Sequence, residues 1–211
     1  MTKVFILNKS ENSRGHIDFV EHQVGAVNIP YEKQDDLYGQ IIGIESFDLP
    51  KQLYFGADYK IIPTIDYPAN SLLIDIMSNQ MLTILSGTGE FKFRTIPVIM
   101  FNHKELEAYH IEEGIGFEDL NERNEDYLAF QLMDFTAAFD KDNSVYRMSR
   151  AFPDEIGSIQ KLVLKEPING FPPIFKIEED VTLLFITEEA KTALETAGIK
   201  GCEFVEVEVS R

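Results

Sequence analysis

The sequence has little cysteine, no long hydrophobic run and few basic residues, and each shortage excludes something. Cys202 is the one cysteine among 211 residues, which excludes an intramolecular disulfide and fits a reducing compartment. The apolar run Val4 to Leu7 is shorter than the roughly 7 to 15 residues of a secretory core, and shorter still than a membrane span. We therefore expect a cytoplasmic protein without a membrane partner.

The shortage of basic residues leaves a strongly negative chain. Nineteen Lys and Arg stand against 36 Asp and Glu, a formal charge of −17, whereas roughly 2 to 8 charges suffice to keep a small domain soluble. A field of this sign repels nucleic acid, and no basic patch with interleaved aromatic residues is present. It attracts a basic partner, although an ordinary acidic surface without a partner is the alternative.

The residues that most often carry catalysis or bind metals do not occur in the required patterns. His103 and His110 are seven residues apart, not the four that let two histidines bind one zinc ion, and His16 and His22 lack ligands at suitable spacing. Cys202 has acidic neighbours, which do not lower a thiol pKa. We therefore predict no catalytic residue, no metal ligand and no cofactor.

Two further motifs are weak. The segment "SGTGE", Ser86 to Glu90, has two glycines but lacks the lysine of a phosphate-binding loop, so we interpret it as the end of a helix. The segment "DKDNS", Asp140 to Ser144, has only part of a calcium-loop pattern. Pairs of neighbouring carboxylates are too common in this chain to indicate an active site.

The hydrophobic pattern predicts an α+β fold with mixed or antiparallel sheets and a few short helices. Short apolar runs separated by Gly and Pro make residues 1–68 β-rich. A helical stripe predicts a helix from Leu72 to Leu85, capped by Asn70 or Ser71. We expect one domain over residues 1–211, with a division into a β-rich lobe 1–68 and an α+β lobe 69–211 as the alternative.

The C-terminal segment has the clearest local pattern. The run Thr182 to Ile186 predicts a strand, Thr187 a helix cap, and Gly198 a helix end. After it, Cys202 to Val209 alternates between apolar residues and glutamates, which predicts a strand with one wet face. The unit is scaffold and contains no catalytic grouping.

Three stretches carry a resemblance to a known family: "MSNQMLTILSGTGEFKFRTIPVIMF" (77–101), "AFDKDNSVY" (138–146) and "INGFPPIFKIEEDVTLLFITEEAKTALETAGIKGCEFVEV" (168–207). In pattern and order they resemble the Imm11 and Imm43 immunity proteins of bacterial polymorphic toxin systems. The resemblance covers about the C-terminal two thirds of the chain. It implies a cytoplasmic antitoxin that binds a cognate toxin domain and blocks it, with no enzyme activity.

Acidic residues are densest between residues 104 and 142, where 12 Asp and Glu stand against Lys104, Arg123 and Lys141. We expect this segment to meet a basic toxin domain, with aromatic side chains as anchors among the acids. The predicted contact residues are Glu105, Glu107, Tyr109, Glu112, Glu113, Phe117, Glu118, Asp119, Glu122, Glu125, Asp126 and Tyr127. The alternative is a small enzyme or ligand-binding domain whose acidic residues act on a cationic or metal-bound substrate.

Overall fold

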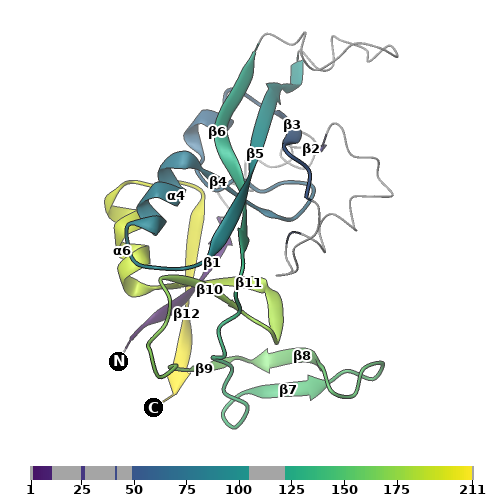
Figure 1. Cartoon of the computed structure of the whole chain (residues 1–211), viewed down its shortest axis with the longest axis vertical. Helices are drawn as coiled ribbons and strands as arrows, with labels where there is room; N and C mark the ends of the chain where they lie inside the picture. The colour runs from purple at the N-terminus through teal and green to yellow at the C-terminus, as the bar shows by residue number, and fades with distance from the viewer. Residues whose placement is uncertain (1, 11–24, 27–40, 42–48, 105–121, 211) are drawn as a thin grey trace.

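The computed structural model describes residues 2–10, 25–26, 41, 49–104 and 122–210. Strands dominate this part of the chain, and two short α-helices, α4 (Asn79–Ser86) and α6 (Glu188–Thr196), lie beside them (Figure 1). The sheets are mixed or antiparallel, and β1 (Val4–Lys9), β2 (Gly25–Ala26) and β3 (Leu53–Ala57) fall within residues 1–68. The predicted α+β class is therefore confirmed.

The first sheet has five strands in the order β10-β11-β1-β12-β9. Their bounds are Ile174–Ile177, Asp180–Thr187, Val4–Lys9, Cys202–Ser210 and Val163–Lys165, respectively. β1 is central and pairs antiparallel with both β11 and β12, while β9 joins β12 in parallel. The N-terminal strand is thus held between strands from the far end of the chain.

The second sheet also has five strands, in the order β2-β3-β5-β6-β4. Their bounds are Gly25–Ala26, Leu53–Ala57, Phe93–Asn102, Arg123–Leu132 and Asp75–Ser78, respectively. Pro97 lies within β5 although it cannot donate a backbone hydrogen bond. β3 begins its pairing with β5 at the next residue, Val98, so Pro97 lies where that edge of β5 is not paired with β3.

The first sheet and the second both contain strands from residues 1–68. β1 lies in the first sheet, whereas β3 pairs with β5 in the second. A boundary near residue 68 therefore does not separate the two sheets.

The helix expected from Leu72 to Leu85 is shorter than predicted. Residues Asp75–Ser78 form β4, paired with β6, and α4 spans Asn79–Ser86. Ser78 caps α4, because its hydroxyl accepts a hydrogen bond from the Met81 amide at 3.1 Å. Leu73, placed on the helical stripe, has a positive φ of 57° and is 71% exposed, so the chain turns there and does not coil.

The C-terminal unit follows its sequence pattern. α6 spans Glu188–Thr196, and the Ala190 amide donates to the Thr187 hydroxyl at 3.4 Å. Gly198 has a φ of 72°, and the amides of Gly198 and Ile199 donate to the carbonyls of Glu195 and Leu194. This is a Schellman ending, which favours glycine because of the left-handed backbone. The predicted strand, helix and strand are confirmed.

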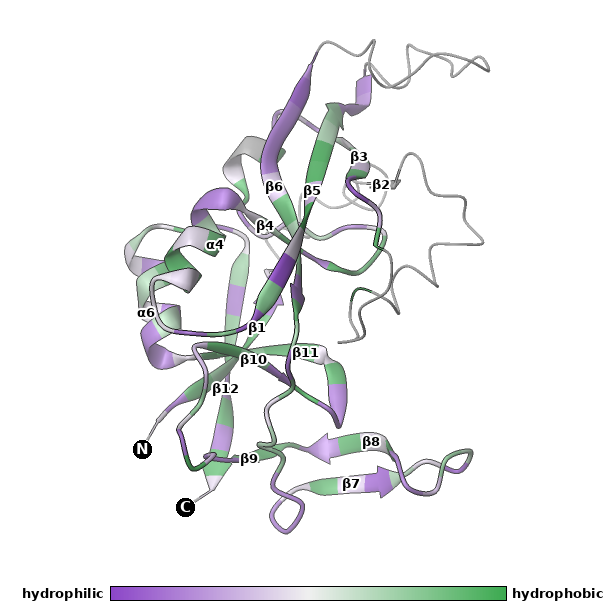
Figure 2. Cartoon of the chain, in the orientation of Figure 1, coloured by the Kyte–Doolittle hydropathy of each residue, from purple (hydrophilic) through white to green (hydrophobic). Residues whose placement is uncertain are grey.

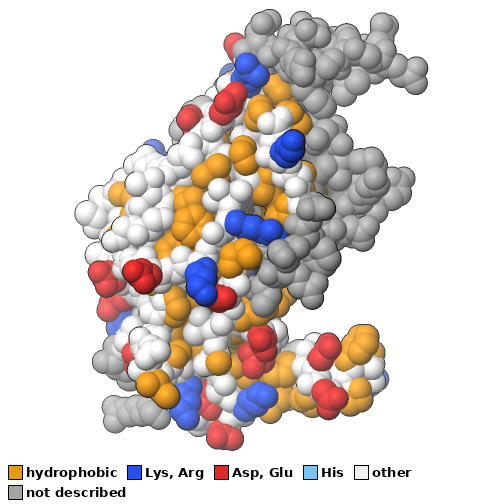
Figure 3. Space-filling view, in the orientation of Figure 1, with side chains coloured by type: hydrophobic (Ala, Val, Ile, Leu, Met, Phe, Trp, Pro, Cys, Tyr) orange, Lys and Arg blue, Asp and Glu red, His pale blue; other side chains and the backbone are white. Residues whose placement is uncertain are grey.

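A hairpin of two strands, β7 (Val145–Met148) and β8 (Ile156–Lys161), forms a separate small sheet that projects from the body (Figure 1). Val145, Met148 and Phe152 are about half-exposed or more, and Figure 3 shows hydrophobic side chains along this hairpin. A two-stranded sheet alone is marginally stable in water, and this hairpin pairs with neither of the two larger sheets.

Three clusters of buried side chains form the core, one within the second sheet, one within the first and one between α4, α6 and the two sheets. Figure 2 shows the hydrophobic residues along β5, in contrast to the hydrophilic start of β6. Neither described helix is long and apolar enough to cross a membrane.

Candidate functional site

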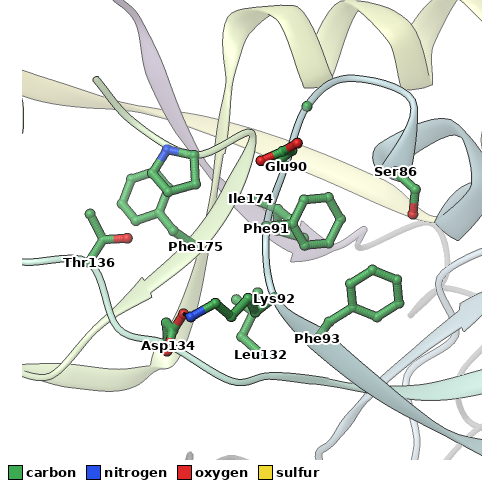
Figure 4. A pocket seen from close by; sticks show the side chains of 12 residues that line it. Ser86, Glu90, Phe91, Lys92, Phe93, Leu132, Asp134, Thr136, Ile174 and Phe175 are labelled. Carbon is green, nitrogen blue, oxygen red and sulfur yellow. Dashed lines mark ion pairs between the residues drawn. The ribbon is translucent and has the colours of Figure 1, made fainter. Parts of the chain in front are cut away.

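A hollow of about 560 Å³ opens where the loop after α4 meets the two sheets. This volume lies within the roughly 300 to 1,000 Å³ typical of ligand pockets. The second sheet contributes the start of β5 and the end of β6, and the first sheet contributes β10 (Figure 4). The lining residues are Ser86, Gly89, Glu90, Phe91, Lys92, Phe93, Leu132, Asp134, Thr136, Pro172, Ile174 and Phe175.

The loop that builds one wall is fixed by its backbone. α4 ends at Ser86, and the Gly87 amide bonds to the carbonyls of the last turn. Gly89 then has a φ of 150°, and a Cβ at this position would lie 3.2 Å from Cγ of Pro173. Glycine therefore lets the loop pass against the segment that leads into β10.

The hollow has an apolar floor and aromatic walls. Leu132 and Ile174 are almost fully buried and form the floor. Phe91 and Phe93 lie 5.0 Å apart between ring centroids, and Phe93 is 36% exposed. In Figure 4 these two rings lie on one side of the hollow, opposite Phe175.

Charged side chains stand at the rim. Nζ of Lys92 lies 3.0 Å from a carboxylate oxygen of Asp134, and the Met133 amide donates to the Lys92 carbonyl at 2.9 Å, which fixes this side of the rim. Glu90 is exposed and forms no ion pair with any residue that the structure describes. The rim therefore carries one carboxylate in excess over its one ammonium group.

This arrangement suits binding more than catalysis. The apolar floor and aromatic walls take apolar or planar groups, and the rim favours positive charge. The described lining contains no cysteine or histidine and no hydroxyl placed against a base, which nucleophilic catalysis requires.

A second group of charged side chains is buried between the sheets. Asp75 of β4 accepts a 2.5 Å hydrogen bond from the Tyr67 hydroxyl, and its carboxylate lies 3.2 Å from Nζ of Lys176 and 3.6 Å from Nζ of Lys9. Nζ of Lys9 also donates to the Ile74 carbonyl at 3.1 Å. Because Lys9 and Lys176 belong to the first sheet and Asp75 to the second, this group joins the two sheets.

The pKa values of this group favour a structural role. Burial alone would raise the pKa of Asp75, but Lys176 and Lys9 outweigh it and hold the pKa below its ordinary value. Burial lowers the pKa of Lys9, which Asp75 partly opposes, and burial together with Asp75 raises the pKa of Tyr67 far above its usual range. Asp75 is thus a charged partner for the two lysines, and Tyr67 a neutral donor.

Eight of the twelve predicted contact residues, those from Glu105 to Asp119, lie outside the described residues. Glu122 directly precedes β6, Glu125 and Asp126 lie near its start, and all three are exposed. The Glu122 carboxylate accepts from Nδ2 of Asn102 at 2.9 Å, and Glu125 pairs with Nε of Arg123 at 3.3 Å.

Tyr127 is a correction. Its side chain is 3% exposed, and its hydroxyl donates to the carbonyls of Ile62 at 2.5 Å and Ile65 at 2.7 Å. The two residues before it, Glu125 and Asp126, are both exposed, and the pairing of β5 with β6 shifts register there, between Val98↔Tyr127 and Met100↔Asn124. Tyr127 therefore faces the core and is not a surface contact residue.

The other sequence candidates have the following positions. His16, His22 and His110 lie outside the described residues. Burial and, secondarily, Asp66 raise the pKa of Cys202 to about 12, so its thiol stays protonated near neutral pH. Among residues 2–10, 49–104 and 122–210, no group of three or more His, Cys, Asp or Glu is arranged to hold a metal ion.

The hollow itself was missed by reasoning from sequence. The segment "SGTGE" indicates only a helix end, and no role was predicted for Phe91 or Phe93. A weak signal was present, because Phe91, Lys92 and Phe93 put a charge between two aromatics at the start of a strand. The wall from β10 lies about 80 residues away in sequence and had no local signal.

No model of a known protein family matches the chain, and no curated protein matches it either.

Proposed function

We propose that this chain is an immunity protein, which binds a cognate bacterial toxin domain in the cytoplasm through an acidic surface and blocks it. The proposal rests on the resemblance to the Imm11 and Imm43 families and on the charge of −17. It requires no enzyme activity and no cofactor of this chain.

The observation that carries the proposal is the placement of the negative charge. Apart from Asp140, the described carboxylates are exposed or half-buried. Within the described part of the chain, ion pairs neutralise some of them, such as Glu195 with Lys191 and Glu208 with Lys161. A surface of this kind accelerates encounter with a basic protein. Nucleic acid is also negatively charged, so the acidic surface competes with it for the basic surface of a toxin that acts on nucleic acid.

The scaffold supports the same function. Two sheets joined by the Asp75 group present their surface with little freedom to rearrange. A surface that is ordered before binding loses less conformational entropy on binding, which increases affinity.

The hollow favours one second candidate, a ligand-binding domain for a cationic small molecule. Its volume and its excess of one carboxylate fit such a ligand. This candidate predicts tight binding of a small cation in the absence of any protein partner.

The test is co-expression with the toxin domain encoded by a neighbouring reading frame. The proposal predicts that host cells survive and that the two chains co-purify, with less complex retained as salt rises. A toxic neighbour that is neither bound nor neutralised would exclude the immunity function. Screening the purified chain against small cations would then test the second candidate.

A further inference from the structure

We infer that the hollow beside Phe91 binds an arginine side chain from a basic segment of the toxin domain. The inference deepens the proposed function and rests on it, because it names the chemistry by which the partner engages this chain. Its occupant is a guanidinium group with its aliphatic stem and the adjoining peptide.

The sign of the charge at the rim selects a cation. Asp134 is already paired with Lys92, whereas Glu90 is exposed without an ion pair among the described residues. The whole chain adds a field of the same sign, with a formal charge of −17. A cationic side chain would therefore find an available carboxylate at the mouth of the hollow.

The walls select arginine over lysine. A guanidinium group is planar, weakly hydrated and stacks on aromatic faces, whereas an ammonium group is compact and strongly hydrated. The rings of Phe91 and Phe93 lie 5.0 Å apart with an interplanar angle of 30°, and Phe93 is partly exposed. Below them, Leu132 and Ile174 offer an apolar floor for the three methylene groups of the stem.

The hollow is also formed before any partner arrives. Its aromatic wall is held from behind, because Phe93 lies 5.6 Å and Phe91 6.3 Å from the ring of Phe130 in the core. On the opposite side, the ring of Phe175 is stacked between Phe171 and Phe185, each 5.2 Å away. Binding an arginine therefore needs little rearrangement of the protein.

The volume of about 560 Å³ exceeds what one side chain fills. The arginine therefore enters with the residues on either side of it. A basic, extended segment of the toxin domain meets this requirement, and such segments hold phosphates in proteins that act on nucleic acid.

The first experiment uses a blocked arginine, Nα-acetyl-arginine methylamide, and its neutral isostere, Nα-acetyl-citrulline methylamide. Both are titrated into the isotopically labelled full chain while backbone amide resonances are followed. We expect saturable shifts for arginine, centred on residues 89–93, with a Kd on the order of millimolar. Shifts of equal size with the citrulline compound, or arginine shifts that spread over distant acidic residues instead, would overturn the inference.

Two variants give the matched comparison. Glu90→Gln removes the rim carboxylate, and Glu178→Gln removes one exposed carboxylate from the β10–β11 turn, outside the hollow. Both variants change the net charge equally. We expect Glu90→Gln to weaken binding of the blocked arginine about threefold, and Glu178→Gln to leave it unchanged. Equal effects of the two variants would mean that only the net charge of the chain attracts arginine, and would overturn the inference.

The second experiment uses the toxin domain and separates this inference from the proposed function. If wild-type chain neutralises the toxin but Glu90→Gln and Phe93→Leu bind it as tightly as wild type, the hollow is not the contact and the immunity function stands. If wild-type chain fails to neutralise the toxin, the proposed function fails whatever the blocked arginine does. Dimerisation of the chain that Glu90→Gln abolishes would make a second copy the occupant and overturn the assignment to the toxin.

Discussion

Lys176 of β10 and Asp75 of β4 form an ion pair of 3.2 Å between side chains that are 6% and 13% exposed. The pair joins the first sheet to the second, and Lys9 of β1 approaches the same carboxylate from 3.6 Å. One carboxylate therefore serves two ammonium groups, and the Tyr67 hydroxyl donates to it as well. Asp75 is the residue on which this junction depends.

Asp75→Asn should destabilise the protein strongly. The change leaves Lys9 and Lys176 without their counter-charge, and breaking a buried pair in this way costs about 3 to 5 kcal/mol. Urea unfolding followed by circular dichroism measures the loss. The exposed pair of Lys92 and Asp134 provides the control, since Asp134→Asn should cost less than about 1 kcal/mol. Equal losses for the two variants would refute the structural role of Asp75.

The same carboxylate predicts how stability changes at acid pH. The pKa of Asp75 lies below its ordinary value in the folded protein, so the unfolded chain binds the proton more readily. The contribution of Asp75 is thus fully present above about pH 4, the pKa of an unfolded aspartate, and is lost as pH falls through the lower folded pKa. The difference in unfolding free energy between wild type and Asp75→Asn should shrink progressively as pH falls below about 4. A constant difference over this range would contradict the lowered pKa.

Gly201→Ala and Gly198→Ala should differ although both glycines have positive φ. A Cβ at Gly201, with φ 90°, would lie 2.7 Å from Cγ2 of Ile65 and 3.1 Å from the Tyr67 carbonyl oxygen. A Cβ at Gly198, with φ 72°, would have no neighbour within 4 Å. We expect about 1 kcal/mol of destabilisation at Gly198 from the backbone alone, and at least about twice that at Gly201. Thermal unfolding of the two variants measures the difference, and a larger loss at Gly198 would be inconsistent with the packing.

Cys202 should react slowly with iodoacetamide in the folded protein. Its pKa is raised to about 12 by burial and by Asp66, so little thiolate forms near pH 8. We expect alkylation on the order of a hundredfold slower than in urea-unfolded chain. Mass spectrometry over time follows the modification, and comparable rates in the two states would show an accessible, ordinary thiol.

Sequence reasoning succeeded where the signals were local. Thr187, Gly198 and the alternation after Cys202 each lie within one turn or one strand, and the C-terminal unit formed as predicted. It failed at Leu72 to Met77, because apolar residues at adjacent positions fit both a helical stripe and a strand. Residues Asp75–Ser78 form a strand because they pair with β6, which is a tertiary contact. The helix begins only after Ser78, whose hydroxyl caps it.

The candidate site was beyond sequence reasoning for a related reason. Lys9, Asp75 and Lys176 are separated by 66 and 101 residues, and Phe91 and Phe175 by 84. Only the sheet order brings their strands together, and no local propensity encodes it. Net charge, by contrast, is additive, so the acidic surface was predictable from composition.

The most direct test of the central claim is inhibition of the purified toxin domain by this chain in a titration at about 50 mM and about 300 mM salt. We expect complete inhibition at one equivalent of chain, with an association rate that falls at least about tenfold at the higher salt. A toxin that stays fully active in excess chain, or one that is inactivated by far less than one equivalent, would contradict a stoichiometric acidic inhibitor.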